Sequence, residues 1–229
     1  MNELRVIPLE GMPEIGAGDD VAALVAAAGG RGPGLEDGDV VVVTQKVVSK
    51  SEGRVVPADA RRAAIDAESV RVLRRAGDMV IAETRHGFVC ANAGVDASNV
   101  PEGGLVLLPE DPDASARRLR ARLRALTGAD VAVIVSDTFG RAWRLGQTDV
   151  AIGVAGIEPF VDYRGRPDMQ GRVMSATRIC VADELAGAAE IVMRKTAGVC
   201  AAIVRGAAIE RGRGAAVEIV RPPGEDLFR

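Results

Sequence analysis

The hydrophobic pattern divides the chain into short apolar runs and amphipathic stretches, separated by glycine-rich loops. Two runs are almost wholly apolar: VVVVT at 40–44 and VAVIVS at 131–136. Runs of this length, rich in β-branched residues, predict strands that are covered on both faces of a sheet. Shorter runs predict further strands, at 4–9, 79–84, 87–91, 105–108, 178–182, 201–206 and 217–220.

Apolar residues that recur every three or four positions predict helices at 19–28, 60–76, 111–128 and about 181–194. Asp19 is the expected cap of the first helix. Acidic residues at the start and Gly128 at the end delimit the third. Short strands, helices and irregular connections indicate a mixed α/β (α+β) fold rather than a regular doubly wound sheet. Because no repeat or linker interrupts the pattern, we expect residues 1–229 to fold as one unit.

Composition narrows the class of protein. Hydrophobic residues make up 48% of the chain and charged residues 27%, as in an ordinary packed core. A net charge of −3 and a pI near 5.4 argue against general binding to nucleic acid or membrane surfaces, so the arginines of 111–128 are interpreted as a solvated face. No apolar run approaches the roughly 20 residues that cross a bilayer, and the N-terminus lacks a signal-peptide pattern. These features predict a cytoplasmic protein.

Cysteine and histidine usage excludes some metal sites. Cys90, Cys180 and Cys200 lie far apart, without a CxxC pair, and are expected to be free thiols. His86 is the only histidine, which excludes HExxH and multi-histidine zinc sites.

Four polar segments follow apolar runs, and the first two offer groups that bind anions. The loop at 8–20 enters a helix N-terminus, where backbone N–H groups can hold an anion, although it could equally be a plain connector. The segment 44–54 holds Lys46 and Lys50, two of the chain's three lysines, spaced to share one helical face. That pair suits a polyphosphate, and the alternative is an ordinary surface turn.

The other two segments offer oxygen ligands. The loop at 90–104 contains Asp96 and Asn99, which suit magnesium or manganese, unless they only bind their own backbone as Asx turns. Asp137 and Thr138 directly follow the strand at 131–136, in what we interpret as a loop, and could hold a hydrated divalent cation. The residues Arg141, Arg144 and Asp149 follow them; the alternative here is a capped turn with a salt bridge.

Together the four segments supply oxygen ligands and cationic side chains but no evident nucleophile. That combination is typical of phosphoryl transfer, in which positioning and charge neutralisation do most of the work. The chain contains no Gly-Lys dipeptide and therefore no Walker loop.

Four segments, GMPEIGAGDD, DGDVVVVTQKVVSKSEGR, NAGVDASNVP and SDTFGRAWRLGQTDVAIGVAG, resemble the coenzyme F-420 γ-glutamyl ligase family. The resemblance runs in order over essentially the whole chain, including CVADELA and the final PPGEDLFR. It implies a family-specific ligase fold of mixed sheets in two intimate lobes, assembled as an intertwined homodimer. It also implies GTP-dependent addition of L-glutamate, through γ-linked amides and an acyl phosphate, to the deazaflavin coenzyme F-420 precursor. Mg²⁺ or Mn²⁺ is the expected metal, with K⁺ as a further candidate.

The resemblance also assigns roles to single residues. Asp96, Asp137 and Thr138 correspond to metal ligands, and Asp137 and Arg144 are the catalytic candidates, with Arg144 near substrate phosphate or carboxylate. The segment 193–199 departs from the family's pattern, so a metal ligand is not expected there and Lys195 is expected to contact phosphate. The expected nucleotide-binding residues are Met12, Pro13, Glu14, Ile15, Gln45, Lys46, Lys50, Asn99 and Lys195.

Two alternatives stay open at the level of sequence. One is an amide ligase with a different acceptor or amino acid. The other is a nucleotide-binding subunit without catalysis, for which the altered segment 193–199 is the only support. Some relatives of this kind are fused to a C-terminal flavin-binding reductase domain, so the chain could also be the N-terminal half of such a fusion.

Overall fold

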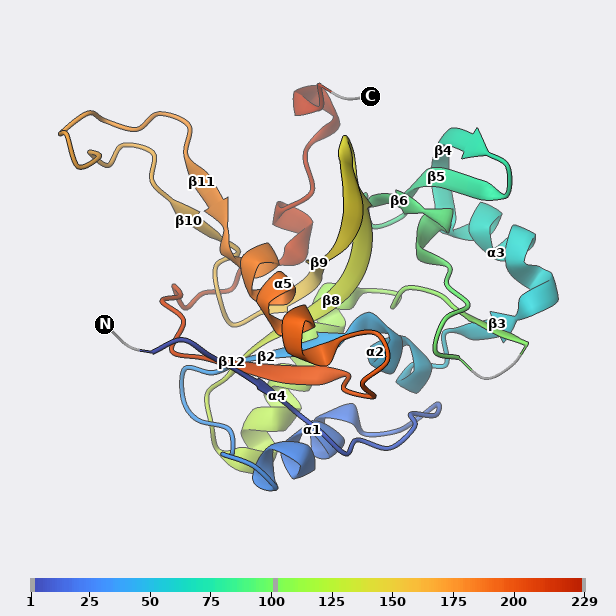
Figure 1. Ribbon diagram of the computed structural model, residues 1–229, viewed down its shortest axis with the longest axis horizontal. Coiled ribbons are helices and arrows are strands. Elements are labelled where there is room, and N and C mark those ends of the chain that lie inside the picture. The colour runs from blue at the N-terminus through green and yellow to red at the C-terminus, as the bar shows by residue number, and fades with distance from the viewer. Residues whose placement is uncertain (1–2, 101–102, 228–229) are drawn as a thin grey trace.

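The computed structural model describes residues 3–100 and 103–227 (Figure 1). The helices are α1 (Val21–Gly30), α2 (Gln45–Ser51), α3 (Arg61–Glu68), α4 (Pro112–Thr127) and α5 (Val181–Met193). The strands are β1 (Arg5–Pro8), β2 (Val40–Thr44), β3 (Val55–Pro57), β4 (Ser69–Ala76), β5 (Met79–Thr84), β6 (Val89–Ala91), β7 (Gly104–Val106), β8 (Ala132–Arg141), β9 (Arg144–Ala155), β10 (Phe160–Asp162), β11 (Arg178–Cys180) and β12 (Ala201–Arg205).

The main sheet has five strands in the order β1-β12-β2-β8-β9. Strands β2 and β8 pair in parallel, whereas the other neighbours in the sheet are antiparallel. Three smaller sheets, β3-β7, β4-β5-β6 and β10-β11, are antiparallel throughout. The predicted mixed α/β fold is confirmed.

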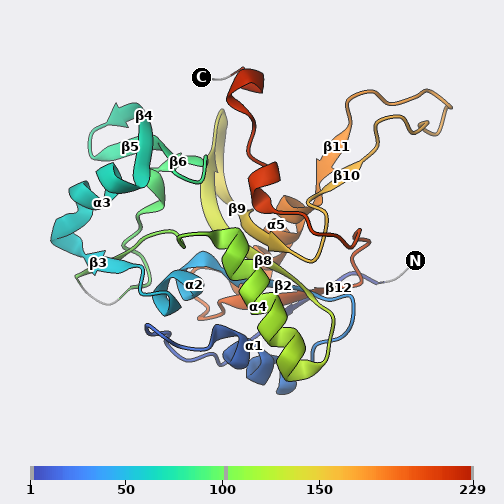
Figure 2. The same cartoon turned by 180° about the vertical axis from the view of Figure 1, so that it is seen from behind.

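Helices cover both faces of the main sheet, which explains the continuous apolar runs in its central strands β2 and β8. Val41 and Val43 belong to one core with residues of α1 and α4. Val40 and Val42 belong to the opposite core, with residues of α5. Side chains alternate between the faces of a strand, so a strand covered on both sides needs a continuous apolar run. Figure 1 shows α5 in front of the sheet, and Figure 2, the view from behind, shows α4 and α1 on the opposite face.

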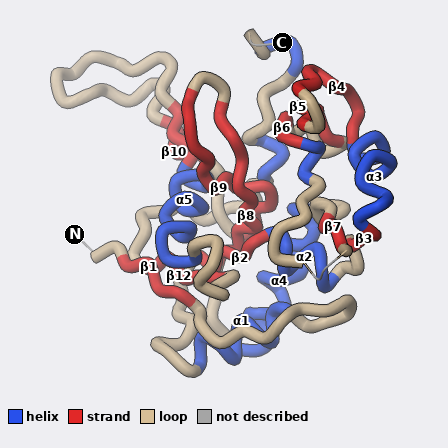
Figure 3. The backbone as a smooth tube through the Cα atoms, turned by 45° about the vertical axis from the view of Figure 1, so that its right-hand side comes forward, coloured by secondary structure: helices blue, strands red, loops and turns tan. Residues whose placement is uncertain are grey.

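A separate small core lies beneath α3 and the sheet β4-β5-β6, at one side of the molecule (Figure 3). Its largest buried side chains are Ile65, Val80, Val95, Leu105 and Leu107. The sheet β3-β7 connects this region to the loop after α2, where the Leu107 N–H donates to the Arg54 carbonyl.

The ends of the helices agree closely with the sequence signals, with one change of cap. Asp111 caps α4 by accepting from the Ala114 N–H at 2.8 Å, and Gly128 ends the helix in a left-handed conformation with φ of 78°. Helix α1 is capped by Asp20, which accepts from the Ala23 N–H at 3.0 Å. The expected cap, Asp19, instead accepts from the Gly16 N–H within the preceding loop.

Two further predictions were wrong. The helix expected at 60–76 ends at Glu68, and the residues after it form β4. Arginine and leucine in that segment favoured a helix, but its alternating valines pair with β5 as an edge strand. The strand expected at 217–220 is absent, because Ala216–Glu218 is a short 3-10 helix whose Glu218 carboxylate accepts from the Ala215 N–H.

The segment after residue 136 forms a hairpin rather than the expected loop. Strand β8 continues through Asp137 to Arg141, and β9 returns from Arg144, so that Thr138 pairs with Asp149. The hairpin projects from the body of the molecule (Figure 1). Among the described residues, no helix is both long and apolar enough to span a membrane.

Candidate active site

The polar segments that follow several strands of the main sheet come together at one end of the sheet. Strands β1 and β2 are both antiparallel to β12, and β8 is parallel to β2, so β1, β2 and β8 point the same way. The parallel pairing of β2 with β8 ends at Thr44 and Ser136, close to the start of β12. Ligand-binding segments commonly lie beyond the carboxyl ends of parallel strands. The segments that follow β1, β2 and α5 come together here.

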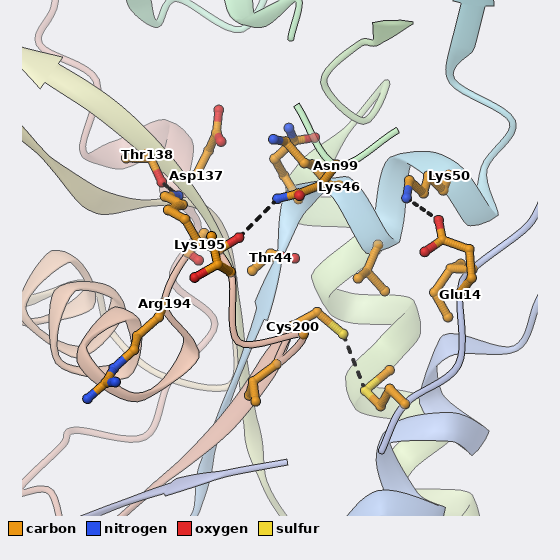
Figure 4. A pocket seen from close by; sticks show the side chains of 18 of the residues that line it. Glu14, Thr44, Lys46, Lys50, Asn99, Asp137, Thr138, Arg194, Lys195 and Cys200 are labelled. Atoms are coloured by element: carbon orange, nitrogen blue, oxygen red, sulfur yellow. Dashed lines mark hydrogen bonds and ion pairs between the residues drawn. The ribbon is translucent and has the colours of Figure 1, made fainter. Parts of the chain in front are cut away.

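A cavity of about 400 Å³ lies at this end of the sheet (Figure 4). Its lining includes every residue that the sequence assigned to nucleotide binding: Met12, Pro13, Glu14, Ile15, Gln45, Lys46, Lys50, Asn99 and Lys195. Two of the three expected metal ligands, Asp137 and Thr138, also line it. The third, Asp96, does not line the cavity but is paired with Lys46, which does.

Lys46 connects the loop of Asp96 to the cavity. Its Nζ lies 2.5 Å from Asp96 Oδ2 and also donates to Ser98 Oγ. Ser98 in turn donates to Asp96 through its N–H and its hydroxyl, both at 2.8 Å. Burial raises the pKa of Asp96, but the bonds from Lys46 and Ser98 outweigh it and hold that pKa below its ordinary value. Asp96 is therefore an ionised carboxylate.

Asp137 has the opposite electrostatic environment. Desolvation raises its pKa to about 7, and the negative charges of Asp149 and Asp96 act in the same direction. The Thr138 N–H and the charge of Lys46 oppose the shift without cancelling it. At neutral pH this carboxyl group is thus divided between its protonated and ionised forms, and positive charge placed beside it would favour ionisation.

Asp149 holds the hydroxyl groups on the neighbouring strand. Its side chain is buried, and it accepts from Ser136 Oγ at 2.9 Å and from Thr138 Oγ1 at 2.5 Å. Lys195 reaches the same group from the segment after α5, donating to Thr138 Oγ1 with its Nζ 3.8 Å from Asp149 Oδ1. The hydroxyl of Thr138 is therefore fixed by a buried anion on one side and an ammonium group on the other.

Helix α2 supplies the remaining charged wall of the cavity. Lys50 is buried there and forms an ion pair with Glu14 of the loop after β1. Gln45 is buried as well and accepts from Ser49 Oγ at 2.9 Å. Its Nε2 has no hydrogen-bond partner among the described residues. A buried amide left without a partner is costly, so this donor is suited to a ligand in the cavity.

The structure places Arg144 elsewhere. It begins β9, pairs with Arg141 in the outer part of the hairpin, and is absent from the lining of the cavity. Its side chain is exposed to solvent. We expected Arg144 near a substrate phosphate or carboxylate, but this residue does not line the cavity.

Sequence reasoning left several lining residues without a role. Asp149 was noted in the segment but not assigned, although its acidic side chain in an otherwise apolar strand end was a usable signal. Arg194 adopts a left-handed conformation, φ 50°, at the end of α5 and turns the chain toward the cavity. Local sequence gives no sign of this conformation. The other unassigned lining residues are Thr44, Val47, Ser136, Thr196, Gly198, Val199 and Cys200.

The donor set suits a hard divalent cation. The residues near the cavity edge offer carboxylate and hydroxyl oxygens, from Asp137, Asp96 and Thr138, which are the ligands that Mg²⁺ and Mn²⁺ prefer. The described residues contain no cluster of three or more histidine, cysteine or acidic side chains arranged to hold a metal. A cation here would therefore draw part of its coordination from water or phosphate, as Mg²⁺ commonly does.

Comparisons with known proteins identify the family of the chain. The family model described as F420-0:Gamma-glutamyl ligase matches residues 11–206. A protein of Methanothermobacter thermautotrophicus named coenzyme F420:L-glutamate ligase is 43% identical to this chain over 249 residues, covering 99% of each chain. Proteins of the same name from Methanopyrus kandleri and Archaeoglobus fulgidus are 42% and 40% identical, and each alignment covers 99% of this chain and 98% or 96% of the relative. The chain belongs to the F420-0:gamma-glutamyl ligase family.

Proposed function

We propose that this protein adds L-glutamate, through a γ-linked amide bond, to the deazaflavin coenzyme F420 precursor at the expense of GTP. Family membership supports the ligase activity, and the names of the relatives supply the acceptor and the amino acid. The observation that carries the chemistry is the meeting of Lys46, Lys50 and Asp137 in one cavity, just beyond the point where the parallel pairing of β2 with β8 ends. Amide formation in water requires an activated carboxylate, and this cavity has the charges for phosphoryl transfer.

The nucleotide would bind along α2 and the loop after β1. Lys46 and Lys50 present ammonium groups from one face of α2, and Lys195 adds a third from the opposite wall. Such groups neutralise phosphate oxygens. The unpartnered amide of Gln45 supplies a buried hydrogen-bond donor at the same place. The loop 12–15 lines the cavity beside Lys50, with which Glu14 pairs, and would contact the base.

The carboxylates would hold the divalent cation. Asp137 and Asp96 are its proposed ligands, with Thr138 as a further donor, and the cation would spread the charge that develops on the phosphate oxygens. Asp149 positions Thr138 by accepting a hydrogen bond from its hydroxyl group. Lys46 already neutralises Asp96, so it is placed to exchange that partner for a phosphate group when the nucleotide enters.

We propose that the reaction proceeds in two steps. The acceptor carboxylate oxygen attacks the terminal phosphorus of GTP, forming an acyl phosphate and releasing GDP. The amine of glutamate then attacks the acyl carbon, an amide bond forms, and phosphate leaves while the amine loses a proton. The lysines stabilise the charge on the transferred group in the first step and on the departing phosphate in the second.

We also propose that the chain works as a homodimer. Two segments that project from the body carry exposed apolar side chains (Figure 1). Trp143 and Leu145 at the end of the β8–β9 hairpin are 79% and 99% exposed, and Met169 between β10 and β11 is fully exposed. Apolar groups gathered on projecting segments are typical of protein–protein contact surfaces.

The proposal is tested by the substrate requirements of phosphate release. We expect release from GTP to need both the coenzyme precursor and L-glutamate, and to stop when either is omitted. Substituting another acceptor carboxylate of similar size provides the matched comparison. Release that is equally fast with unrelated acceptors would assign the protein to a different amide ligase activity. Nucleotide binding without any release under all combinations would assign it to a non-catalytic role.

A further inference from the structure

The arginines of α4 fall into two groups that face different surroundings. Arg118 and Arg122 are both matched by acidic groups, with Arg118 2.7 Å from Glu52 and Arg122 2.9 Å from Asp20. The other three, Arg117, Arg120 and Arg124, are spaced to share a second face of the helix and line a cavity of about 490 Å³. The whole set therefore does not form one solvated face, as the sequence suggested.

The far wall of this second cavity is a glycine-rich segment near the C-terminus. Gly212, Arg213 and Gly214 line it, facing α4 (Figure 2). The segment is held to the N-terminal end of α4 because the Asp113 carboxylate accepts from the Ala216 N–H at 2.7 Å. A Cβ at Gly214 would come within 2.3 Å of Pro159 Cδ, so the close approach of this segment requires glycine. The backbone of a fourth arginine, Arg213, is therefore held opposite the three arginines of α4.

The guanidinium group of Arg120, which lines the cavity, is held in place by hydrogen bonds. Its Nε donates to the Val131 carbonyl at 2.8 Å and its Nη2 lies 2.7 Å from Asp130. A Cβ at Gly156 would lie 2.5 Å from Arg120 Nε, so the guanidinium is seated against a position that only glycine allows. Arg120 is thus preorganised by the protein itself.

The remaining arginines of the cavity lack comparable partners. Among the described residues, the side chains of Arg124 and Arg213 have no ion pair or hydrogen bond. Arg117 is 3.9 Å from Asp111, and both side chains are more than half exposed, so this pair is weak. Two acids lie at the wall of the cavity, and neither pairs with the side chain of Arg124 or Arg213. Asp130 serves Arg120 and Arg211, and Glu158 accepts from the Arg213 backbone N–H.

We infer that this second cavity, between α4 and the segment 212–214, is a binding site for a small polyanion carrying phosphate or carboxylate groups. Guanidinium groups match both kinds of oxyanion through paired hydrogen bonds, and several unneutralised arginines around one concavity favour a multiply charged ligand. The site is separate from the first cavity. It lies beside Ala155 and Gly156, at the end of the β8–β9 ladder away from the Arg141–Arg144 pair, and the two cavities share no lining residue.

The test is isothermal titration calorimetry with two probes, tripolyphosphate and citrate, without divalent metal. Every protein carries Lys46→Gln, which weakens anion binding in the first cavity. We expect at least one probe to bind, and Arg124→Gln/Arg213→Gln to weaken that binding at least about tenfold. The tighter probe identifies phosphate or carboxylate as the natural group. Arg118→Gln/Arg122→Gln is the matched control, since it removes the same charge from the same helix and should leave binding within about twofold of the parent.

Two results would overturn the inference. One is the absence of binding by both probes in the parent protein. The other is equal loss of affinity in the two double variants, which would mean that only the general charge of α4 attracts anions. Arg124 and Arg213 are exposed, so both double variants should fold, and thermal melting checks this. The single variants Arg124→Gln and Arg213→Gln should each lose part of the affinity if the two arginines share one ligand.

Discussion

The ammonium group of Lys46 lies 2.5 Å from the carboxylate of Asp96, and the same positive charge opposes the rise in the pKa of Asp137 that burial causes. One lysine at the start of α2 thus links two acidic groups from separate parts of the chain. In Lys46→Ala, Asp96 loses its ion-pair partner and Asp137 loses a stabilising charge. We expect nucleotide affinity to fall about tenfold or more, because a phosphate contact is lost as well. Calorimetric titration with GDP and Mg²⁺ measures this.

Arg74→Ala is the matched control for that substitution. Arg74 is an exposed cation on β4, outside both cavities. Its removal should leave GDP affinity unchanged. Equal losses in the two variants would mean that net charge, rather than the position of Lys46, governs nucleotide binding.

Asp137 is expected to make the protein less stable as pH rises. Its folded-state pKa is about 7 against an ordinary value of 3.8, so between these values the folded protein holds a proton that the unfolded chain has lost. The free energy of unfolding therefore decreases as pH rises toward 7, by at most about 4 kcal/mol from this group, since one pKa unit is worth about 1.4 kcal/mol. Asp137→Asn cannot ionise and should flatten this part of the pH profile, as measured by denaturant unfolding from pH 4 to 8. A profile identical in the two proteins would contradict the assignment.

The same variant separates an enzyme from a binding protein. Asp137→Asn should retain nucleotide binding within about tenfold, because the lysines remain, while turnover falls at least about a hundredfold through loss of a metal-ligand charge. Parallel assays of GDP binding and phosphate release measure both. Full activity in Asp137→Asn would remove this residue from the site.

Much of the site could be predicted because its residues follow strong strand signals. The runs 40–44 and 131–136 are continuous and apolar, so the positions just after them, including Lys46 and Asp137, were placed at strand ends from sequence alone. That they meet is a consequence of the parallel register between Thr44 and Ser136, which local sequence does not encode.

The hairpin was missed for a physical reason. Its outer half is exposed, so Phe139 to Thr148 carry no alternating apolar pattern, and the segment resembles a polar loop. Its strand structure is imposed by pairing with a neighbouring strand rather than by burial. The same holds for β4, whose residues are almost all exposed. The second cavity escaped prediction because its walls, α4 and the segment 212–214, are far apart in the chain.

Gly153 is expected to be essential for the packing of α4 on β9. A Cβ at this position would lie 2.3 Å from the Pro112 carbonyl oxygen, which belongs to rigid backbone at the helix start. Gly153→Ala should lower the free energy of unfolding by about 3 kcal/mol through overpacking. Gly30→Ala is the control, because no atom lies within 4 Å of its Cβ and it ends a helix, and it should be neutral or slightly stabilising. Thermal melting that ranks the two variants in the opposite order would contradict the packing described.

The proposed dimer can be tested at the hairpin end. Leu145→Asp adds a charge to a side chain that is 99% exposed, so the isolated subunit should fold unchanged while association weakens. Light scattering after size exclusion should show a dimer for the natural protein and a shift toward monomer for the variant. Val70→Asp, on exposed β4, is the control and should remain dimeric. A natural protein that is monomeric at all concentrations would contradict the proposal.

The most direct test of the central claim is the mass spectrum of the coenzyme precursor after incubation with the protein, GTP, Mg²⁺ or Mn²⁺ and L-glutamate. The account predicts that its mass increases by whole glutamyl residues, only when GTP is present, and that any second glutamyl residue is joined to the γ-carboxyl group of the first. Precursor recovered unchanged, from protein shown to bind GTP and metal in the same solution, would contradict it.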